Sequence, residues 1–269
     1  MGLTKFVGGL GFLKQRMDAT GAGLTPLIWH DCPILEMMTD PAKGILAGDD
    51  FTVVQTTGFP YEISGTNGTF LGLAGSPGVA VLTAPALDNN ECHIAFNNDV
   101  AGLITCNATK KWWFEARVKL SQIADTFGVF VGLMQQAASQ DALMADDDMI
   151  LTAGIDKIGF QIVEAAANAA PYWQTMMDLA ARASVSATAA LASVNYVKLG
   201  MKSEPNADAT VATVKFFVDG VELADTTNTG ATNFPLNTVL IPHFGIKTGA
   251  AAGVAMTLTL DWWKAAQLR

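Results

Sequence analysis

Histidine is the side chain most often used as a general base, and this sequence has three: His30, His93 and His243. None lies within one helical turn of another, and His243 falls in the middle of an apolar segment, 241–247. No G-x-S-x-G segment provides the sharp turn that exposes a nucleophilic serine. We therefore expect no catalytic triad and no enzyme activity, with the His243 ring satisfied in or near the core.

Sulfur and acidic ligands are also poorly placed for a metal ion. Cys32, Cys92 and Cys106 are odd in number and widely spaced, which is typical of buried free thiols and not of a zinc site or a disulfide framework. Two polar segments, 88–91 and 146–148, offer oxygen ligands to Ca²⁺, but neither interleaves acids with glycine and carbonyl donors. We expect solvated loops at both segments, and no metal and no cofactor.

Composition narrows the classes of partner. Of the 269 residues 50% are hydrophobic and only 15% are charged, against about 25% in an average protein. The net charge of −9 argues against nucleic-acid binding, which needs clustered Lys and Arg. No apolar run reaches the roughly 18 residues that cross a bilayer, and residues 1–17 do not have the pattern of a signal peptide. Low charge in a chain rich in Ala, Gly and Thr indicates a surface covered by neighbouring molecules; the alternative is an Ala-rich globular protein.

Short segments of alternating hydrophobicity, separated by Gly, Asn and Pro, follow one another from residue 49 to the end of the sequence. About ten to thirteen such strands predict an all-β fold, a two-sheet antiparallel β-sandwich of the jelly-roll type. Asp219-Gly220 and Asn67-Gly68 are turn signals of the kind found in hairpins. Residues 126–134 are apolar on both faces, as expected in the middle of a sandwich.

The clearest strand is the segment 110–121. Every second residue from Phe114 to Leu120 is apolar, whereas the alternate residues from Glu115 to Lys119 are charged. This period of two predicts one face on the core and one face in water.

Two other segments are ambiguous. Residues 135–148 contain helix formers and predict a short helix or a loop. Residues 172–192 have helix propensity but lie between strands, so we expect a strand and a turn there.

The sequence divides into an extended arm, residues 1–48, and the sandwich, residues 49–269. The arm is rich in glycine near its start, with a short helix expected at 12–17. Its scattered Leu, Phe, Ile and Met side chains need a surface to lie on, which is either its own body or a neighbouring subunit.

The order of the strands, "WFEARVKL", "FGVFVGLM", "KIGFQIV", "YVKLGMK", "VKFFVDGVEL" and "IPHFGIKTG", resembles the concanavalin A-like lectin/glucanase superfamily, including laminin-G-like domains. The resemblance covers residues 110–263 and implies a concanavalin A-like sandwich. Glucanases of that superfamily carry alternating acids on one strand, E-x-D-x-E, and this sequence has no such run, because Ala116 and Arg117 follow Glu115.

The lectins of that superfamily imply a different activity, glycan binding. Trp29, Trp112, Trp173 and Trp263 offer rings that could stack on sugars if they are exposed. The opposing interpretation places these tryptophans in the core or at a subunit interface, where aromatic residues are enriched. The doublets Trp112-Trp113 and Trp262-Trp263 send their two rings to opposite faces of a strand, so one ring of each should lie outside the core or at an interface.

The upstream segment "IWHDCPILEMMTDPAKGILAGDDF" (28–51) and the ending "DWWKAAQLR" resemble proteins encoded among the head genes of tailed bacteriophages, in particular capsid decoration or cement proteins. This resemblance implies a non-enzymatic structural protein on the capsid surface of the virion, made in the host cytoplasm. Its expected partners are the major capsid protein and copies of itself, as a dimer or trimer. A glycan-binding module of a head fibre or tail is the alternative.

Large apolar side chains of the arm and one member of each Trp doublet are the candidate residues for the partner interface. They are Phe6, Phe12, Leu13, Leu27, Trp29, Ile34, Trp112 and Trp263.

Overall fold

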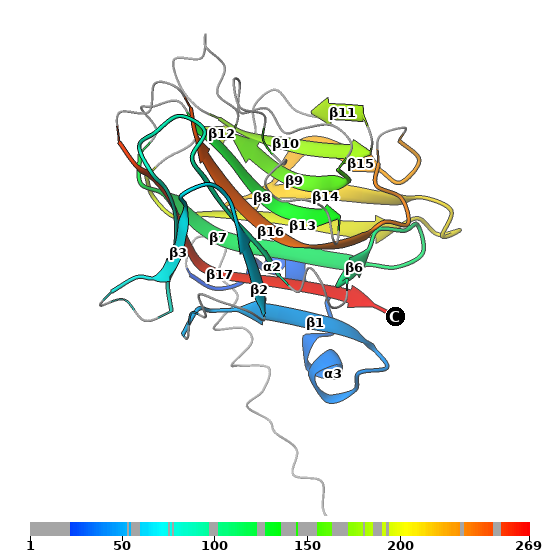
Figure 1. The fold of residues 1–269 in the computed structure, drawn as a ribbon. Coiled ribbons are helices and arrows are strands. Elements are labelled where there is room, and N and C mark those ends of the chain that lie inside the picture. The colour runs from blue at the N-terminus through cyan, green and yellow to red at the C-terminus, as the bar shows by residue number, and fades with distance from the viewer. Residues whose placement is uncertain are drawn as a thin grey trace, which may run out of the picture.

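The computed structural model describes most of the chain from residue 22 onward. The described residues are 22–52, 54, 60–74, 76, 78–96, 102–122, 127–135, 144, 155–162, 172–179, 181–184, 190–191, 194–231, 234–249 and 254–269. Within them the strands form two antiparallel sheets that stack as the layers of a sandwich (Figure 1). The predicted fold class is confirmed.

The first sheet has the strand order β15-β14-β13-β7-β17-β4-β3, and β1 pairs with residues 263–268 of β17, beyond the part of β17 that pairs with β4. Its strands are β1 (Gly44–Asp49), β3 (Thr69–Gly72), β4 (Ala80–Ala84), β7 (Trp112–Leu120), β13 (Val197–Pro205), β14 (Ala212–Val218), β15 (Val221–Asn228) and β17 (Met256–Leu268).

The second sheet has the order β11-β10-β9-β8-β16-β5-β2, with β12 against β10 and β6 against β16. Its strands are β2 (Tyr61–Ser64), β5 (Glu91–Phe96), β6 (Ile104–Thr105), β8 (Phe127–Gln135), β9 (Lys157–Ile162), β10 (Tyr172–Leu179), β11 (Ala181–Ser184), β12 (Ala190–Leu191) and β16 (Val239–Thr248).

The inward side chains of both sheets form one core. Phe114 of β7 lies 6.5 Å from Phe244 of β16, and Phe160 of β9 lies 5.8 Å from Phe216 of β14, measured between ring centroids. The expected inward face of β7, from Phe114 to Leu120, lies in this core as predicted. Aromatic pairs therefore join the two layers.

Strand β8 is buried along its length up to Met134, as its two apolar faces predict. The segment 172–192 contains β10, β11 and β12, so the expectation of strands there is confirmed over its described residues. The helix or loop expected at 135–148 lies outside the described residues, apart from Gln135 and Met144.

Asp219 and Gly220 join β14 to β15 with φ values of 48° and 79°. Two successive positive φ values match the turn type that fits the twist of a two-residue hairpin, so this prediction is confirmed. Asn67-Gly68 is different: β2 and β3 on either side of it belong to different sheets, so the turn carries the chain from one layer to the other.

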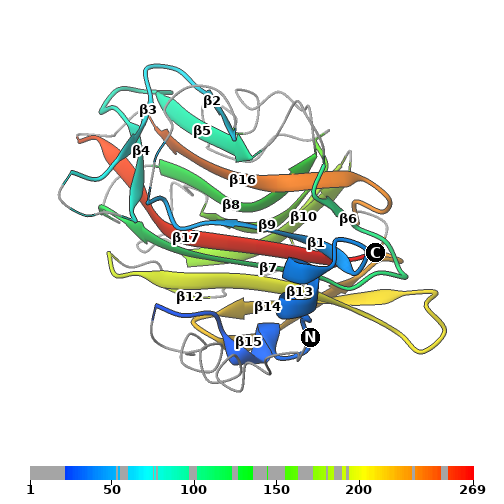
Figure 2. The same ribbon diagram turned by 90° about the horizontal axis from the view of Figure 1, so that it is seen from below.

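Residues 22–48 lie against the body of the same chain and contain two short helices, α2 (Pro26–Trp29) and α3 (Ile34–Thr39). The first strand, β1, begins at Gly44 and runs antiparallel to the C-terminal half of β17 (Figure 2). The expected boundary at residue 48 therefore falls inside β1. Residues 1–21, with the helix expected at 12–17, lie outside the described residues.

The exposed turn between β13 and β14 contains a backbone strain that a substitution can relieve. Ala209 has a φ of 52°, a left-handed conformation that costs a residue with a Cβ about 1–2 kcal/mol. We expect Ala209→Gly to raise the free energy of unfolding by about 0.5–1 kcal/mol and the melting temperature by about 2 °C. Ala207→Gly, in the same turn but at an ordinary φ, is the control and should lower both. Equal effects of the two substitutions in differential scanning calorimetry would contradict this explanation.

Candidate functional site

The helices α2 and α3 cover the outer face of the first sheet (Figure 2). Ile28, Trp29 and Met37 pack there in a second apolar cluster, which includes Trp113 of β7 and Phe217 of β14. Gly200 of β13 makes room for α2, because a Cβ at this position would lie 2.3 Å from Cδ1 of Ile28. The side of β7 expected to face water is therefore covered at Trp113 and Glu115 by the N-terminal part of the same chain, whereas Arg117 and Lys119 farther along it stay partly exposed.

Glu115 is the centre of the polar contacts beneath α2. Its carboxyl group is buried and accepts three hydrogen bonds: from the Thr25 backbone N–H (3.0 Å), the Thr25 hydroxyl (2.5 Å) and Nε1 of Trp29 (2.8 Å). Burial raises the pKa of Glu115, and the bonds from Thr25 and Trp29 oppose that effect in part. One carboxyl group thus fixes both the start and the end of α2.

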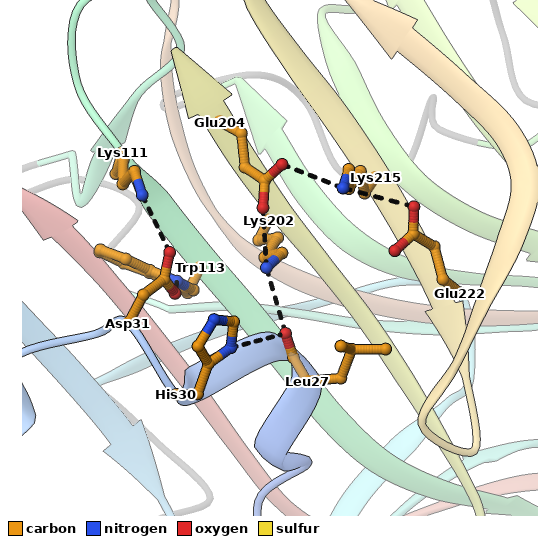
Figure 3. A network of polar contacts seen from close by, with 9 residues as sticks. All are labelled: Leu27, His30, Asp31, Lys111, Trp113, Lys202, Glu204, Lys215 and Glu222. Carbon is orange, nitrogen blue, oxygen red and sulfur yellow. Dashed lines mark hydrogen bonds and ion pairs between the residues drawn. The ribbon is translucent and has the colours of Figure 1, made fainter. Parts of the chain in front are cut away.

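Asp31, just after α2, binds a different pair of residues on the sheet. Its carboxylate accepts hydrogen bonds from Nζ of Lys111 (2.9 Å) and Nε1 of Trp113 (3.0 Å) (Figure 3). Partial burial acts to raise the pKa of Asp31, but the bonds from Lys111 and Trp113 outweigh it, and the pKa lies below its usual value.

Long side chains of the first sheet donate hydrogen bonds to main-chain carbonyls of residues 22–27. Lys198 donates to the carbonyl of Gly23 (3.1 Å), Lys202 to that of Leu27 (3.1 Å) and Nε1 of Trp262 to that of Ala22 (2.6 Å).

Lys202 begins a chain of ion pairs along β13, β14 and β15. It lies 2.8 Å from Glu204, which lies 3.0 Å from Lys215, and Lys215 lies 3.5 Å from Glu222 (Figure 3). Burial acts to raise the pKa of Glu204, but Lys202 and Lys215 lower it more strongly, so the pKa is reduced. Residues 22–31 are therefore held by charged groups of β7 and β13 and by Lys111, and the ion pairs continue from β13 to β14 and β15.

The inward sides of α2 and α3 pack on the first sheet, and their outward sides carry large apolar side chains. Leu27, Leu35 and Met38 are 45%, 48% and 69% exposed. Leu35 and Met38 are three residues apart on α3 and so lie on the same side of it. We call Leu27, Leu35 and Met38 the docking face.

The structure places the other candidate interface residues differently. Trp29, Ile34, Trp112 and Trp263 are all buried within the chain, so their side chains are not available to a partner. Phe6, Phe12 and Leu13 lie outside the described residues, which leaves Leu27 as the exposed candidate among those described. The physical reason differs between them. Trp112 and Trp263 point into the main core between the sheets. Trp29 and Ile34 face the first sheet from the two helices, where they pack with Trp113, the outward ring of its doublet.

The tryptophans offered for stacking on sugars are also buried. Trp29, Trp112, Trp173 and Trp263 are at most 1% exposed. A glycan site on this chain would therefore need other residues than these four rings.

Two of the three histidines first considered for catalysis lie on the opposite side of the molecule. His93 of β5 and His243 of β16 are buried and meet on the outer face of the second sheet, with Nδ1 of His93 3.3 Å from Nε2 of His243. His30 is exposed at the end of α2. Glu91, from the acidic segment 88–91, lies 3.2 Å from Nε2 of His93 and is buried.

In the described part of the chain, no group of three or more His, Cys, Asp or Glu side chains is placed to hold a metal ion. Neither of the helices described here is long and apolar enough to cross a bilayer.

Comparison with known proteins gives no match at the level of sequence. No protein-family model matches the chain, and no curated protein matches it. Solved structures do match. Peanut lectin with a bound 9mer peptide is 14% identical with a TM-score of 0.57, over 85% of this chain and 99% of the lectin.

Two other structures match with slightly lower TM-scores. The carbohydrate recognition domain of Emp47p is 11% identical, with a TM-score of 0.53 over 84% of this chain and 97% of that domain. The endo-1,3-beta-glucanase from Streptomyces sioyaensis is 10% identical, with a TM-score of 0.53 over 85% of this chain and 98% of the enzyme. At such low identity these matches show the fold alone, and lectins and a glucanase share it. The chain is a two-sheet antiparallel β-sandwich of the concanavalin A-like type.

Proposed function

We propose that this chain is a non-enzymatic structural module that attaches to a larger protein assembly through the docking face. The observation that carries the proposal is the exposure of Leu27, Leu35 and Met38 on two helices whose other sides are packed on the first sheet. The α2 segment is held there by the bonds of Glu115 and Asp31, and α3 by the apolar contacts of Ile34 and Met37. Large apolar side chains on a rigid support can be buried by a partner with little loss of conformational freedom. The sequence resemblance to phage head proteins makes the shell of a tailed-phage head the proposed assembly, with the chain as a decoration or cement protein.

The energetics fit a protein that binds in many copies. Burying three half-exposed apolar side chains contributes roughly 1 kcal/mol each, or about 3 kcal/mol in total. A stable interface buries about 1,000 Å² or more, so neighbouring surface must contribute as well. A module that binds the assembled shell and not its separate subunits stabilises the shell by mass action.

The test combines localisation with a matched pair of variants. Cryo-electron microscopy of particles from the source is expected to show the sandwich on the outside of the shell, with α2 and α3 turned towards it. In a co-sedimentation assay with heads lacking this chain, the double variant L35E/M38E should bind at least tenfold more weakly, because it loses apolar burial and introduces charge. The control L87E/V221E changes two side chains that are each 66% exposed outside the docking face, and it should bind like the wild type.

Absence of the chain from particles, or equal binding of L35E/M38E and wild type, would contradict the proposal.

A second candidate function is carbohydrate binding, favoured by the likeness in fold to lectins and to the carbohydrate recognition domain of Emp47p. It predicts that a polysaccharide raises the melting temperature of the isolated chain, and that L35E/M38E leaves this shift unchanged.

A further inference from the structure

Four buried side chains form a polar cluster on the outer face of the second sheet, opposite in the sandwich to the docking face. Glu91 and His93 come from β5, and His243 and Lys247 come from β16. The antiparallel register pairs Lys247 with Glu91 and Gly245 with His93. Because Gly245 has no side chain, the His93 ring can lie across it towards His243; a Cβ at position 245 would be 2.2 Å from Nδ1 of His93.

The hydrogen-bond partners of the ring nitrogens indicate which nitrogen of His93 and of His243 carries a hydrogen. The Glu91 carboxylate only accepts, so Nε2 of His93, 3.2 Å from Oε2 of Glu91, carries a hydrogen. With Nε2 of His93 as the donor to Glu91, we take Nδ1 of His93 as the acceptor, and Nε2–H of His243 donates to it over 3.3 Å. This leaves Nδ1 of His243 without a proton, and no partner for it is found among the described residues.

A proton added to Nδ1 of His243 would create a buried cation at a nitrogen to which the described residues offer no acceptor. Burial, together with the neighbouring His93, holds the pKa of His243 well below its usual value. The other groups around it on the described strands do not compensate. On β8, the residue opposite His243 is Gly132, and the Phe130 ring lies 5.8 Å from the His243 ring. The charged groups are Glu62, which lies on β2 beyond Ala95, and two lysines. Lys247 lies 3.4 Å from Glu91 and donates to the Met144 carbonyl, and Lys157 of β9 donates to the Ile155 carbonyl.

We propose that Glu91, His93, His243 and Lys247 form an acid-sensitive clasp between β5 and β16, which closes at neutral pH and loosens when His243 takes a proton. Strands β5 and β2 form one edge of the second sheet beyond β16, so loosening the clasp opens that edge. The closed state holds His243 neutral, whereas in the open state its pKa is near 6.5. The open population therefore rises as the pH falls below about 6.5, and is about tenfold larger at pH 5.5 than at neutral pH.

Hydrogen–deuterium exchange of the whole chain at pH 7.5, 6.5 and 5.5, corrected for the chemical exchange rate, tests the clasp. Peptides covering residues 91–96 and 240–247 are expected to lose about tenfold in protection between pH 7.5 and 5.5. Peptides covering residues 112–120 and 256–268 of the first sheet should change less than twofold.

Two variants remove the titrating ring. His243→Phe keeps a ring of similar size, and His243→Asn keeps a polar group, and either one should make the protection of 91–96 independent of pH in this range. The exposed His30 provides the control, and His30→Gln should retain the wild-type loss. Unchanged protection in acid, a loss spread equally over both sheets, or a loss that persists in both His243 variants would overturn the proposal.

Discussion

Replacing Glu115 by alanine is expected to lower the free energy of unfolding by about 3–5 kcal/mol, because three buried donors lose their acceptor at once. The Thr25 N–H, the Thr25 hydroxyl and the Trp29 indole all point to this carboxyl group, and none of them faces water. Urea unfolding followed by tryptophan fluorescence measures the loss. Limited proteolysis should also cleave the variant first within residues 22–43, because the anchor of α2 is gone.

The conservative variant Glu115→Gln separates charge from hydrogen bonding. Its carbonyl oxygen can accept from Thr25 and Trp29, and its NH₂ group can donate to the Thr25 hydroxyl, so the expected loss is about 1 kcal/mol. The folded-state pKa of Glu115 is raised, so the folded chain binds this proton more tightly than the unfolded chain does. The glutamate therefore costs stability as the pH rises above about 4.5, and the comparison with wild type should shift in favour of Glu115→Gln between pH 5 and 7.5. A glutamine variant as unstable as the alanine variant, or a difference independent of pH, would contradict this account.

Trp263→Ala is the second substitution with a large expected effect, a loss of about 3–5 kcal/mol. The Trp263 ring is 1% exposed and lies 4.8 Å from the Phe96 ring, and its Nε1 donates to the Tyr61 hydroxyl over 2.8 Å. The Tyr61 hydroxyl in turn donates to Asp49 at the end of β1, so removal of the indole leaves a cavity and breaks this chain of bonds.

Thermal and urea unfolding of the isolated chain measure this effect. Trp263→Phe keeps the ring contact and should lose about 1–2 kcal/mol, and Val221→Ala, at an exposed position, should stay within about 0.5 kcal/mol of wild type. If Trp263 acted only at an interface between subunits, the isolated Trp263→Ala chain would be as stable as wild type, and that result would reject the core assignment.

The sequence was sufficient to predict the layered architecture, because alternation reports directly which side of a strand is apolar. The strands predicted in the segments 110–121 and 126–134 and the turn at Asp219-Gly220 are confirmed over their described residues for this reason. Alternation does not report what covers the other side. Glu115 and Trp113 were expected in water or at an interface, and they are buried because α2 and α3 fold back over them.

A short signal for that covering was present in the sequence. Thr25-Pro26 is a typical helix start, with proline at the first helical position, but the glycine-rich surroundings favoured an extended arm. Two other features need the register of the strands. A bulge between Leu260 and Trp262 shifts the alternation in β17 and turns Trp263 inward. His93 and His243 are 150 residues apart, and only the pairing of β5 with β16 brings them together.

The pairing of β1 with the last strand has a practical consequence for attaching reporters. Leu268 is paired with Gly44, and the Arg269 N–H donates to the Lys43 carbonyl, so a fluorescent protein fused after Arg269 would emerge beside α3 and crowd Leu35 and Met38. Position 87 follows β4, which pairs with the opposite end of β17, a strand of 13 residues and so about 40 Å long. A dye on Leu87→Cys would label the far end, and the native thiols should compete little, since burial raises the pKa of Cys32 and Cys92 to about 12.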